Sequence, residues 1–399
     1  MKKKEKLLFP VVCILLFGLG LETGGFQLSV LQMAKEFQIS SASMGLMIGA
    51  QYGAIMLMPL IFGKRSDRWG KKYVILGAML VFLAGCLLIV AAPGYGLVLA
   101  GIFVLGSGYS VCESTATAVL TDQFAKKAGG YISLTQSCFS LGAVAGPLLV
   151  DYGIRRFGMD WRLTFWMAAG LYACMLVPML CTQVRPLQLS AGTPSGKEGH
   201  RFRPDLVMGC LIFAMVIYVG IENGTGYFAD TFLELDLQIT GKASGVIAAF
   251  WSAMILSRIV SGILYRLKRR LLLICYTGSM LLLGGLYFVS DLHVVTVMFF
   301  LMGLFYGPVW PALMGIAAEE YPERTGAVTG LMASACGAGG ALFPVLMGWA
   351  LNMFGVRASY LMMAGMAGLA IAAILRLYIH LNGKSAGRKR GDWHVPSEK

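Results

Sequence analysis

Apolar segments of roughly 20 residues, each long enough for a helix to cross the ~30 Å hydrocarbon core of a bilayer, occur twelve times in this chain. Only 13% of the residues are charged, against about 25% in soluble domains, and 57% are hydrophobic. We therefore predict an all-α membrane protein with twelve transmembrane helices. The expected spans are 7–30, 43–62, 73–92, 97–120, 131–150, 163–180, 206–232, 243–264, 271–289, 294–318, 327–353 and 360–381.

The basic residues are distributed unequally between the two sides of the predicted membrane domain. With both termini in the cytoplasm, six of the 33 lysines and arginines fall outside, and the other 27, Arg258 and Arg376 included, fall on the cytoplasmic side. This bias follows the positive-inside rule and indicates the orientation. The net charge of +13 therefore reflects topology in a lipid bilayer and not nucleic-acid binding. The compact loops favour a bacterial inner membrane. The six outer residues are Lys35, Arg155, Arg156, Arg162, Lys242 and Arg357.

The sequence also contains an internal repeat. Gly20–Gly24 (GLETG) returns as Gly220–Gly224 (GIENG), and from Phe103 to Gly158 the matches keep a constant offset of 197 residues. Such a repeat in an apolar chain is typical of transporters built from two related halves, with the substrate bound between them. We expect two pseudo-symmetric six-helix halves around a central cavity. The expected boundaries are 1–182 and 205–383 for the halves, 183–204 for a cytoplasmic linker and 384–399 for a disordered basic tail.

Residue types that support metal binding or catalysis are not grouped in the sequence. The nine cysteines lie almost entirely in predicted helices, and no two have metal-ligand spacing. The four histidines lie in loops or at helix ends. Since no nucleophilic triad or metal site can be assembled, the sequence predicts a protein that is not an enzyme and needs no cofactor.

The strongest local motif follows the second predicted span. Residues Gly63–Lys72 read GKRSDRWGKK, which resembles the signature G-x-x-x-D-R-x-G-R-R of the major facilitator superfamily. The resemblance extends over the whole chain, since twelve helices in two six-helix halves are also the fold of that superfamily. A second copy at Gly262–Arg270 keeps the glycine but carries Arg266 in place of the acid, so the acidic role is confined to the first half.

Four residues are expected to act in gating: Gly63, Asp67, Arg68 and Thr325. Gly63 has no side chain and lets a neighbouring helix approach closely. We expect the Asp67 carboxylate to face the positive end of the helix that starts near Thr325, its expected N-cap. The resemblance implies that this contact closes the cytoplasmic side and favours the outward-open state. A purely topological role suits the neighbouring lysines but not an acid in a positive loop.

Three glutamates, Glu22, Glu113 and Glu222, fall inside predicted spans. An ionisable group at membrane depth costs at least ~2.5–3.5 kcal/mol and persists mainly where it lines a cavity or finds a partner. The resemblance places all three on cavity-lining helices. Burial makes a carboxylate easier to protonate near neutral pH, as a coupling site needs. We therefore predict Glu22 and Glu113 as proton-coupling residues, and Glu222 with Asn223 as substrate ligands.

Packing against a local hydroxyl or backbone group is the alternative for each glutamate. The repeat argues against it, because it relates Glu22 to Glu222 and predicts that they face one another at equal depth across the cavity. The other expected substrate contacts are polar or aromatic residues of the same helices: Gln51, Gln136, Tyr109, Tyr306, Trp251 and Trp310.

Two prolines, Pro308 and Pro311, fall in the tenth predicted span and should break its helix, because each removes a backbone hydrogen bond. A broken helix beside a cavity exposes carbonyl groups and can act as a hinge. Trp310 lies between the prolines and is the repeat partner of Glu113. Its indole either stacks on the apolar face of a sugar or packs against neighbouring helices.

Finer motifs favour a proton-coupled symporter of a sugar or related polar solute. Tyr218–Glu222 with Gly226, and Tyr321–Gly326 before a glycine-rich helix, resemble the fucose–proton symporter branch of the superfamily. That branch uses acidic residues of its first and fourth helices, which Glu22 and Glu113 match. The expected partners are a small-molecule substrate, protons and lipid, and we expect a monomer that works by alternating access.

Two other functions stay open. Gly142–Pro147 begins the G-x-x-x-G-P motif of drug–proton antiporters, but Val150 and Asp151 replace its final glycines. The helix-four arginine of those exporters is absent, with Ile102 in its place. A sensor that binds solute without transport is the third function, and the intact signature argues against it.

Overall fold

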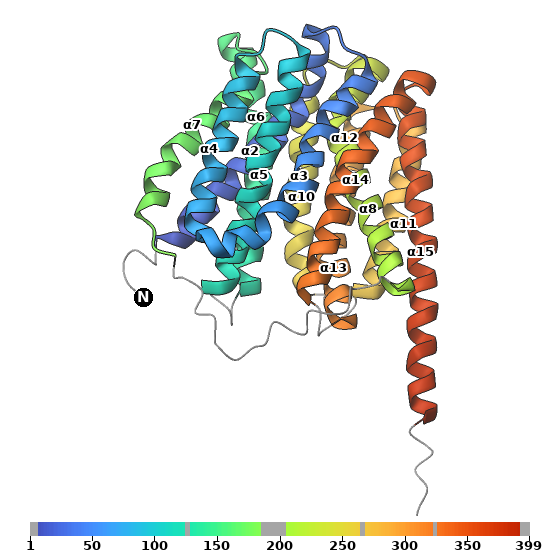
Figure 1. Ribbon diagram of the computed structural model, residues 1–399. Helices are drawn as coiled ribbons and strands as arrows, with labels where there is room; N and C mark the ends of the chain where they lie inside the picture. Colours follow the sequence, from blue (N-terminus) through green and yellow to red (C-terminus); the bar gives the residue numbers. More distant parts are fainter. Residues whose placement is uncertain (1–6, 124–127, 185–204, 264–267, 322–324, 392–399) are drawn as a thin grey trace, which may run out of the picture.

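The computed structural model describes residues 7–123, 128–184, 205–263, 268–321 and 325–391; at some helix ends, residues 63–68 among them, only the backbone is described. The described residues form helices and no strand. Twelve of these helices are long and apolar enough to cross a membrane, which confirms the predicted number of spans. Figure 1 shows them standing side by side in one bundle.

Each half of the chain contributes six spanning helices. Those of the N-terminal half are α2 (Leu8–Glu36), α3 (Ser41–Trp69), α4 (Lys71–Val90), α5 (Tyr95–Gln123), α6 (Ala128–Phe157) and α7 (Leu163–Cys181). Those of the C-terminal half are α8 (Leu206–Tyr227), α10 (Ala243–Ile263), α11 (Lys268–Gly285), α12 (Leu292–Tyr306) with α13 (Val309–Glu320), α14 (Thr325–Phe354) and α15 (Val356–Gly391). Short elements follow α8 and α11, namely α9 (Ala229–Thr231), the π-helix η2 (Phe232–Asp236) and the 3-10 helix η4 (Leu286–Phe288).

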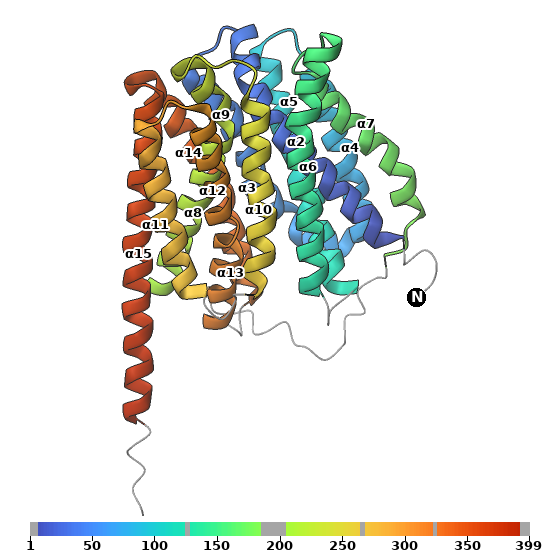
Figure 2. The ribbon, with the colours of Figure 1, turned by 180° about the vertical axis from the view of Figure 1, so that it is seen from behind.

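The two sets of helices lie side by side, and two long helix pairs join them. α3 packs along α14, and α6 packs along α10. Figures 1 and 2 show these pairs at the middle of the bundle from opposite sides. Within the halves, α2 packs on α6 and, at the repeat-related place, α8 packs on α14. The start of α2 and the end of α15 lie at the same end of the bundle, as an even number of spans requires.

The internal repeat is also visible in the backbone. Gln38 and Gln238, 200 residues apart, have φ of 51° and 59° and are the non-glycine residues with positive φ in the described part of the chain. Gly158 and Gly355, 197 residues apart, follow α6 and α14 with φ of 62° and 86°. Glycine is favoured there because it adopts the left-handed region without strain. Both halves therefore make the same turns at the same places.

Glycines let α2 and α6 approach to backbone contact. A Cβ on Gly20 would overlap the carbonyl group of Phe139, and a Cβ on Gly142 would overlap that of Phe17. Gly146 faces the Leu21 carbonyl in the same way. Close packing therefore accounts for both glycines that begin the antiporter-like motif, and it sets the position of the helix that carries Glu22.

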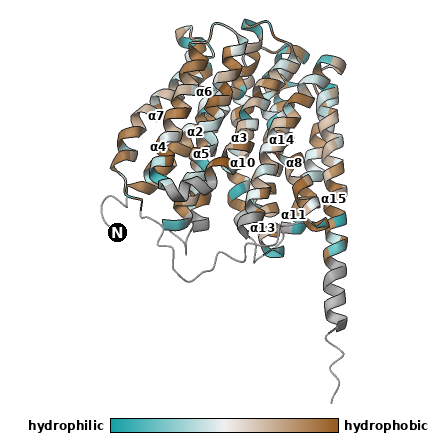
Figure 3. Ribbon diagram, viewed as in Figure 1, coloured by the Kyte–Doolittle hydropathy of each residue, from teal (hydrophilic) through white to brown (hydrophobic). Residues whose placement is uncertain are grey.

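Several helices are longer than the sequence predicts, and α3 and α15 are two of them. α3 continues past Phe62 to Trp69 and ends before Gly70, whose φ is 85°. The signature segment is therefore mostly helical and not a loop. α15 continues to Gly391, so residues 384–391 of the predicted disordered tail are helical, and 392–399 lie outside the described residues. Figure 3 shows mainly hydrophobic residues along the middle of the helices, with hydrophilic residues toward both ends of the bundle.

The predicted break in the tenth span is confirmed. α12 ends at Tyr306 and α13 begins at Val309, with Gly307 and Pro308 in the turn between them. Pro311 adds no second break, because it lies in the first turn of α13, where a missing N–H leaves no hydrogen bond unmade. One further break was not predicted: α8 ends at Tyr227, so the span expected at 206–232 is interrupted at Phe228.

Candidate functional site

Three glutamates from three helices gather around Tyr52 of α3. Glu22 lies at the middle of α2, Glu113 lies in α5 and Glu222 lies in α8. All three carboxylates act electrostatically on the Tyr52 hydroxyl, which donates to Asn223 Oδ1 at 2.5 Å. The structure thus brings the predicted acids together where the halves meet. Sequence reasoning missed Tyr52, although its place beside Gln51 makes a polar pair inside an apolar span.

Glu22 is fully buried and bound to Gln51. The Gln51 side-chain nitrogen lies 3.2 Å from each Glu22 carboxylate oxygen, and the Gln51 oxygen accepts from the Tyr227 hydroxyl of α8 at 3.2 Å. Gly106 of α5 allows this arrangement, since a Cβ there would stand 2.7 Å from the Gln51 carbonyl oxygen. Within the described part of the chain, no lysine or arginine forms an ion pair with Glu22. The contacts from Glu22 through Gln51 to Tyr227 therefore join the halves without a cation.

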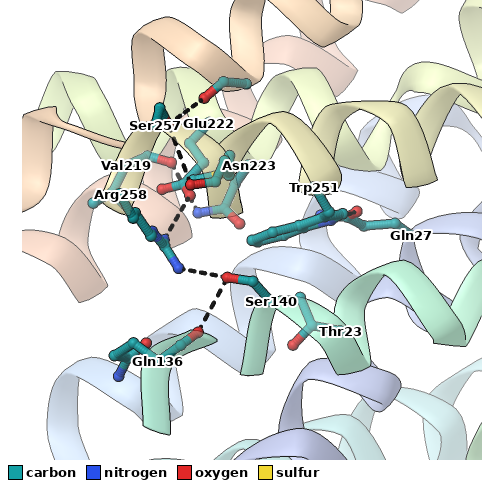
Figure 4. Close-up of polar contacts among 12 residues, drawn as sticks. Thr23, Gln27, Gln136, Ser140, Val219, Glu222, Asn223, Trp251, Ser257 and Arg258 are labelled. Carbon is teal, nitrogen blue, oxygen red and sulfur yellow. Dashed lines mark hydrogen bonds and ion pairs between the residues drawn. The ribbon is translucent and has the colours of Figure 1, made fainter. Parts of the chain in front are cut away.

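Arg258 of α10 joins the other two glutamates. Its guanidinium lies 4.0 Å from the Glu222 carboxylate and donates to the Ser140 hydroxyl of α6 at 2.8 Å. Ser140 donates to the Gln136 carbonyl at 3.1 Å, and the Gln136 amide lies 3.3 Å from a Glu113 oxygen. Figure 4 shows Arg258 reaching from α10 toward Ser140 and Gln136, with Glu222 above it. A polar path therefore crosses from one half to the other.

The sequence analysis counted Arg258 among the cytoplasmic residues at helix ends. The expected span 243–264 already contained Arg258, and the structure shows that its side chain lies in this polar path. A signal was present in the sequence, because Arg258 follows Trp251 by seven residues, a spacing that puts both on one face of a helix. The indole of Trp251 donates to the Gln27 side chain at 2.9 Å, which is again a contact between the halves.

The predicted aromatic contacts other than Trp310 are buried in hydrogen-bonded pairs. Trp251, Tyr109 and Tyr306 are 4%, 6% and 2% exposed. The tyrosine hydroxyls lie 3.4 Å from Thr23 and 3.1 Å from Thr225, respectively. The polar atoms of these aromatic side chains are therefore occupied in this conformation, and a substrate would have to displace their partners to reach them.

Trp310 differs from the other predicted aromatic residues. It lies in the first turn of α13, directly after the helix break, and is 40% exposed. It contacts Cys336 of α14. Its indole is thus accessible and also has a packing partner, so the two interpretations made from the sequence both stay open.

Polar contacts also join the halves at the end of the bundle opposite the start of α2 and the end of α15. Figure 2 shows α9 near the upper end of the bundle, beside α2. At the same end of the bundle, Gly45 of α3 and Gly348 of α14 let these two helices approach to backbone contact. These contacts hold the two halves together at that end of the bundle. The polar contacts are the ion pair of Lys35 with Glu234, the hydrogen bond of Arg155 to the Gly241 carbonyl, and that of Ser244 to Asp151 at 3.0 Å.

The predicted gating contact falls outside the described side chains. The backbone of α3 runs through Gly63, Asp67 and Arg68, and α14 begins at Thr325, but the side chains of these residues lie outside the described residues. Their gating role stays a prediction. Among the described residues no group of three or more histidine, cysteine or acidic side chains could hold a metal ion.

A sequence model of the Major Facilitator Superfamily matches residues 11–344, with a further match at 266–398. The chain belongs to the major facilitator superfamily. This facilitator also has the fold of solved members: a crystal structure of a mutant of the nucleoside transporter NupG superposes with a TM-score of 0.78, over 93% of this chain and 100% of NupG. At 14% identity this likeness concerns the fold alone.

Curated relatives of the facilitator differ in what they transport. The "Uncharacterized MFS-type transporter YfkL" of Bacillus subtilis is 24% identical over 341 residues, 80% of this chain and 82% of YfkL. The glucose/mannose transporter GlcP of the same organism is 25% identical over 264 residues, 63% of this chain and 64% of GlcP. The multidrug resistance protein MdtH of Aeromonas hydrophila is 24% identical over 297 residues, 70% and 68% of the two chains. The chain thus resembles both sugar and multidrug transporters.

Proposed function

We propose that this facilitator is a proton-coupled symporter of a sugar or related polar solute and works by alternating access. One observation carries the proposal. Where the halves meet, three carboxylates, three side-chain amides, an arginine and tyrosine hydroxyls form polar contacts that cross between the halves. Such groups suit the hydroxyls of a polar solute. A lipophilic solute that displaced their partners would leave them unsatisfied, at ~1–3 kcal/mol for each group.

Glu22 is the proposed proton-coupling residue. A charged carboxylate buried without a cation is strongly disfavoured, so we expect Glu22 to be neutral in this conformation. Its hydrogen-bond partner Gln51 is itself bound to Tyr227 of the other half. A change in the protonation of Glu22 therefore alters a contact between the halves, which is how proton binding would bias their movement.

Glu113 is proposed as a second proton-coupling residue. It is joined to Glu222 through Gln136, Ser140 and Arg258. A change in the charge of Glu113 would therefore alter the hydrogen bonds of this polar path. Glu222 and Asn223 stay proposed substrate ligands. Arg258 and Tyr52 are added to them because the structure places both in contact with these residues.

The proposed cycle needs a gate at each end of the molecule. The outer contacts described above would hold the outer side closed. The contact of Asp67 with the start of α14 near Thr325 would hold the cytoplasmic side closed in the opposite state, since the carboxylate can face the positive end of that helix. Gly63 and Arg68 would belong to the same cytoplasmic gate.

A drug–proton antiporter is the second candidate. The likeness to MdtH and the Gly142–Pro147 segment favour it. However, Gly142 and Gly146 are needed for the backbone contact of α6 with α2, so they do not by themselves indicate export.

We also propose that the protein is a monomer in a bacterial inner membrane. Both termini would lie in the cytoplasm, since 27 of the 33 basic residues then lie inside.

Uptake of a panel of labelled sugars into proteoliposomes under an imposed inward proton gradient tests the proposal. With one proton per solute, a gradient of about two pH units supports up to ~100-fold accumulation, since each unit is worth a factor of ten. Glu22→Gln should abolish this accumulation and preserve counterflow, because the amide stands in for the protonated acid. Glu36→Gln on the same helix is the matched control, because Glu36 pairs with Arg162 at the outer end of the molecule. Gradient-driven export of lipophilic cations by the wild type would instead support the antiporter.

A further inference from the structure

A buried acid, Asp230, lies at the outer end of the bundle and is not part of the glutamate network. It belongs to the short helix α9, and its side chain is only 3% exposed. α9 packs against α2, α8, α10 and η2. It stands between the break in α8 at Phe228 and the π-helix η2, and π-helical backbone occurs often at functional sites.

The charged groups around Asp230 oppose its ionised form more than they favour it. Glu234 of η2 and Asp151 of α6 oppose ionisation, and Lys35 of α2 favours it. Lys35, however, is paired with Glu234, and Asp151 is paired with Arg155 at 2.8 Å. Burial is the largest effect, followed by Glu234, and together they raise the pKa of Asp230 to about 7. Among the described residues, α8 and α10 add no charged group to those that act on it.

The same groups hold the halves together at the outer side. Lys35 and Asp151 belong to the N-terminal half, and their partners Glu234 and Ser244 belong to the C-terminal half. When the halves separate there, Asp230 gains water and its pKa returns toward about 3.9, the value of a hydrated aspartate. The adjacent Thr231 hydroxyl is buried and has no hydrogen-bond partner in the described part of the chain, which lowers the cost of opening this segment.

We propose that Asp230 is a proton-binding site of the outer gate, and that its protonation favours closing of the outer side. The inference rests on the alternating-access part of the proposed function and not on the transported solute. A proton that enters from outside would then help to close the gate behind the substrate, which is the order of events that symport needs.

The sign of the pH dependence follows from linkage. The closed gate binds the proton more tightly than the open gate, so low pH favours the closed state. As the pH rises between the two pKa values, from about 4 to about 7, the ratio of closed to open gates falls by up to about tenfold per pH unit. Above about pH 7 the ratio no longer changes on account of this residue.

Hydrogen–deuterium exchange of the full-length protein in lipid nanodiscs tests the proposal. The exchange of residues 228–244, corrected for the intrinsic exchange rate, gives the equilibrium constant for opening of this segment. In the wild type this constant should increase at least tenfold from pH 5 to pH 7 and then level off. Asp230→Asn should keep this segment closed and remove the pH dependence. Asp236→Asn is the matched control in the same segment, because Asp236 pairs with Arg357 of its own half at 2.7 Å; its pH profile should match the wild type.

A second variant gives an independent result if Asp230→Asn does not fold. Glu234→Gln removes the acid beside Asp230 and leaves Lys35 without its partner. Both changes favour ionised Asp230, so the pH at which opening levels off should move to a lower value. A pH-independent wild type, or an unchanged profile in Asp230→Asn, would overturn the outer proton site. Sugar uptake measured on the same samples distinguishes the two proposals. Proton-driven uptake with pH-independent opening would contradict only the outer proton site. A pH-dependent opening without sugar uptake would contradict only the symport of sugar.

Discussion

Replacing Gly142 by alanine should push α6 away from α2. A Cβ at this position would overlap the Phe17 carbonyl oxygen and stand 2.7 Å from the Leu21 nitrogen. Both are main-chain atoms, so no side-chain rotation can relieve the overlap. Because Leu21 precedes Glu22, the same displacement would shift Glu22 relative to Gln51 and weaken its two 3.2 Å contacts.

The size of the effect follows from two opposing contributions. Forcing extra atoms into a well-packed interface costs ~1–3 kcal/mol, and a rigid backbone neighbour places Gly142→Ala at the upper end of that range. Replacing a helical glycine by alanine returns ~0.5–1 kcal/mol through the lower backbone entropy of the unfolded chain. The net expected loss in the free energy of unfolding is therefore about 2 kcal/mol.

The measurement is the midpoint of unfolding of the purified protein in mixed micelles, with transport measured in parallel. Gly170→Ala in α7 is the matched control, because a Cβ there would meet nothing within 4 Å. It should stabilise the protein slightly, by ~0.5–1 kcal/mol. If Gly142→Ala unfolded like the wild type yet lost transport, the packing argument would be refuted. The glycine would then act directly in function, as the antiporter motif implies.

Three further variants test the site and the cytoplasmic gate. Asp67→Asn should slow transport and leave substrate binding largely intact, because the carboxylate holds a gate; an equal loss of binding in calorimetry would contradict this. Glu113→Gln should abolish gradient-driven uptake but allow counterflow exchange, and unchanged driven uptake would exclude Glu113 as a coupling residue. Arg258→Gln removes a charge-assisted hydrogen bond worth ~1.5–3 kcal/mol and should lower kcat/KM about tenfold or more. Arg269→Gln, whose surface partner is Glu320, is its control and should transport normally.

The amino-acid sequence by itself determined the architecture of this protein. Twelve spans follow from hydropathy over windows of about 20 residues, which is a local property of the chain. The two-fold repeat needed only a comparison of the chain with itself, and the turns at Gln38 and Gln238 confirm it in the backbone. The break at Pro308 was also predictable, because the loss of a backbone donor depends on one residue type.

The partners within the site were decided only by the tertiary structure. Gln51 of α3 meets Glu22 of α2 and Tyr227 of α8 where the halves come together, and the packing that places it there involves backbone contacts between helices far apart in sequence. Hydropathy could not predict the direction of the Arg258 side chain, because an arginine near a helix end can extend its long side chain either to the cytoplasm or into the bundle. Its meeting with Glu222 and Ser140 depends on the rotation of α10 against α6 and α8, and no pattern along one helix specifies that rotation.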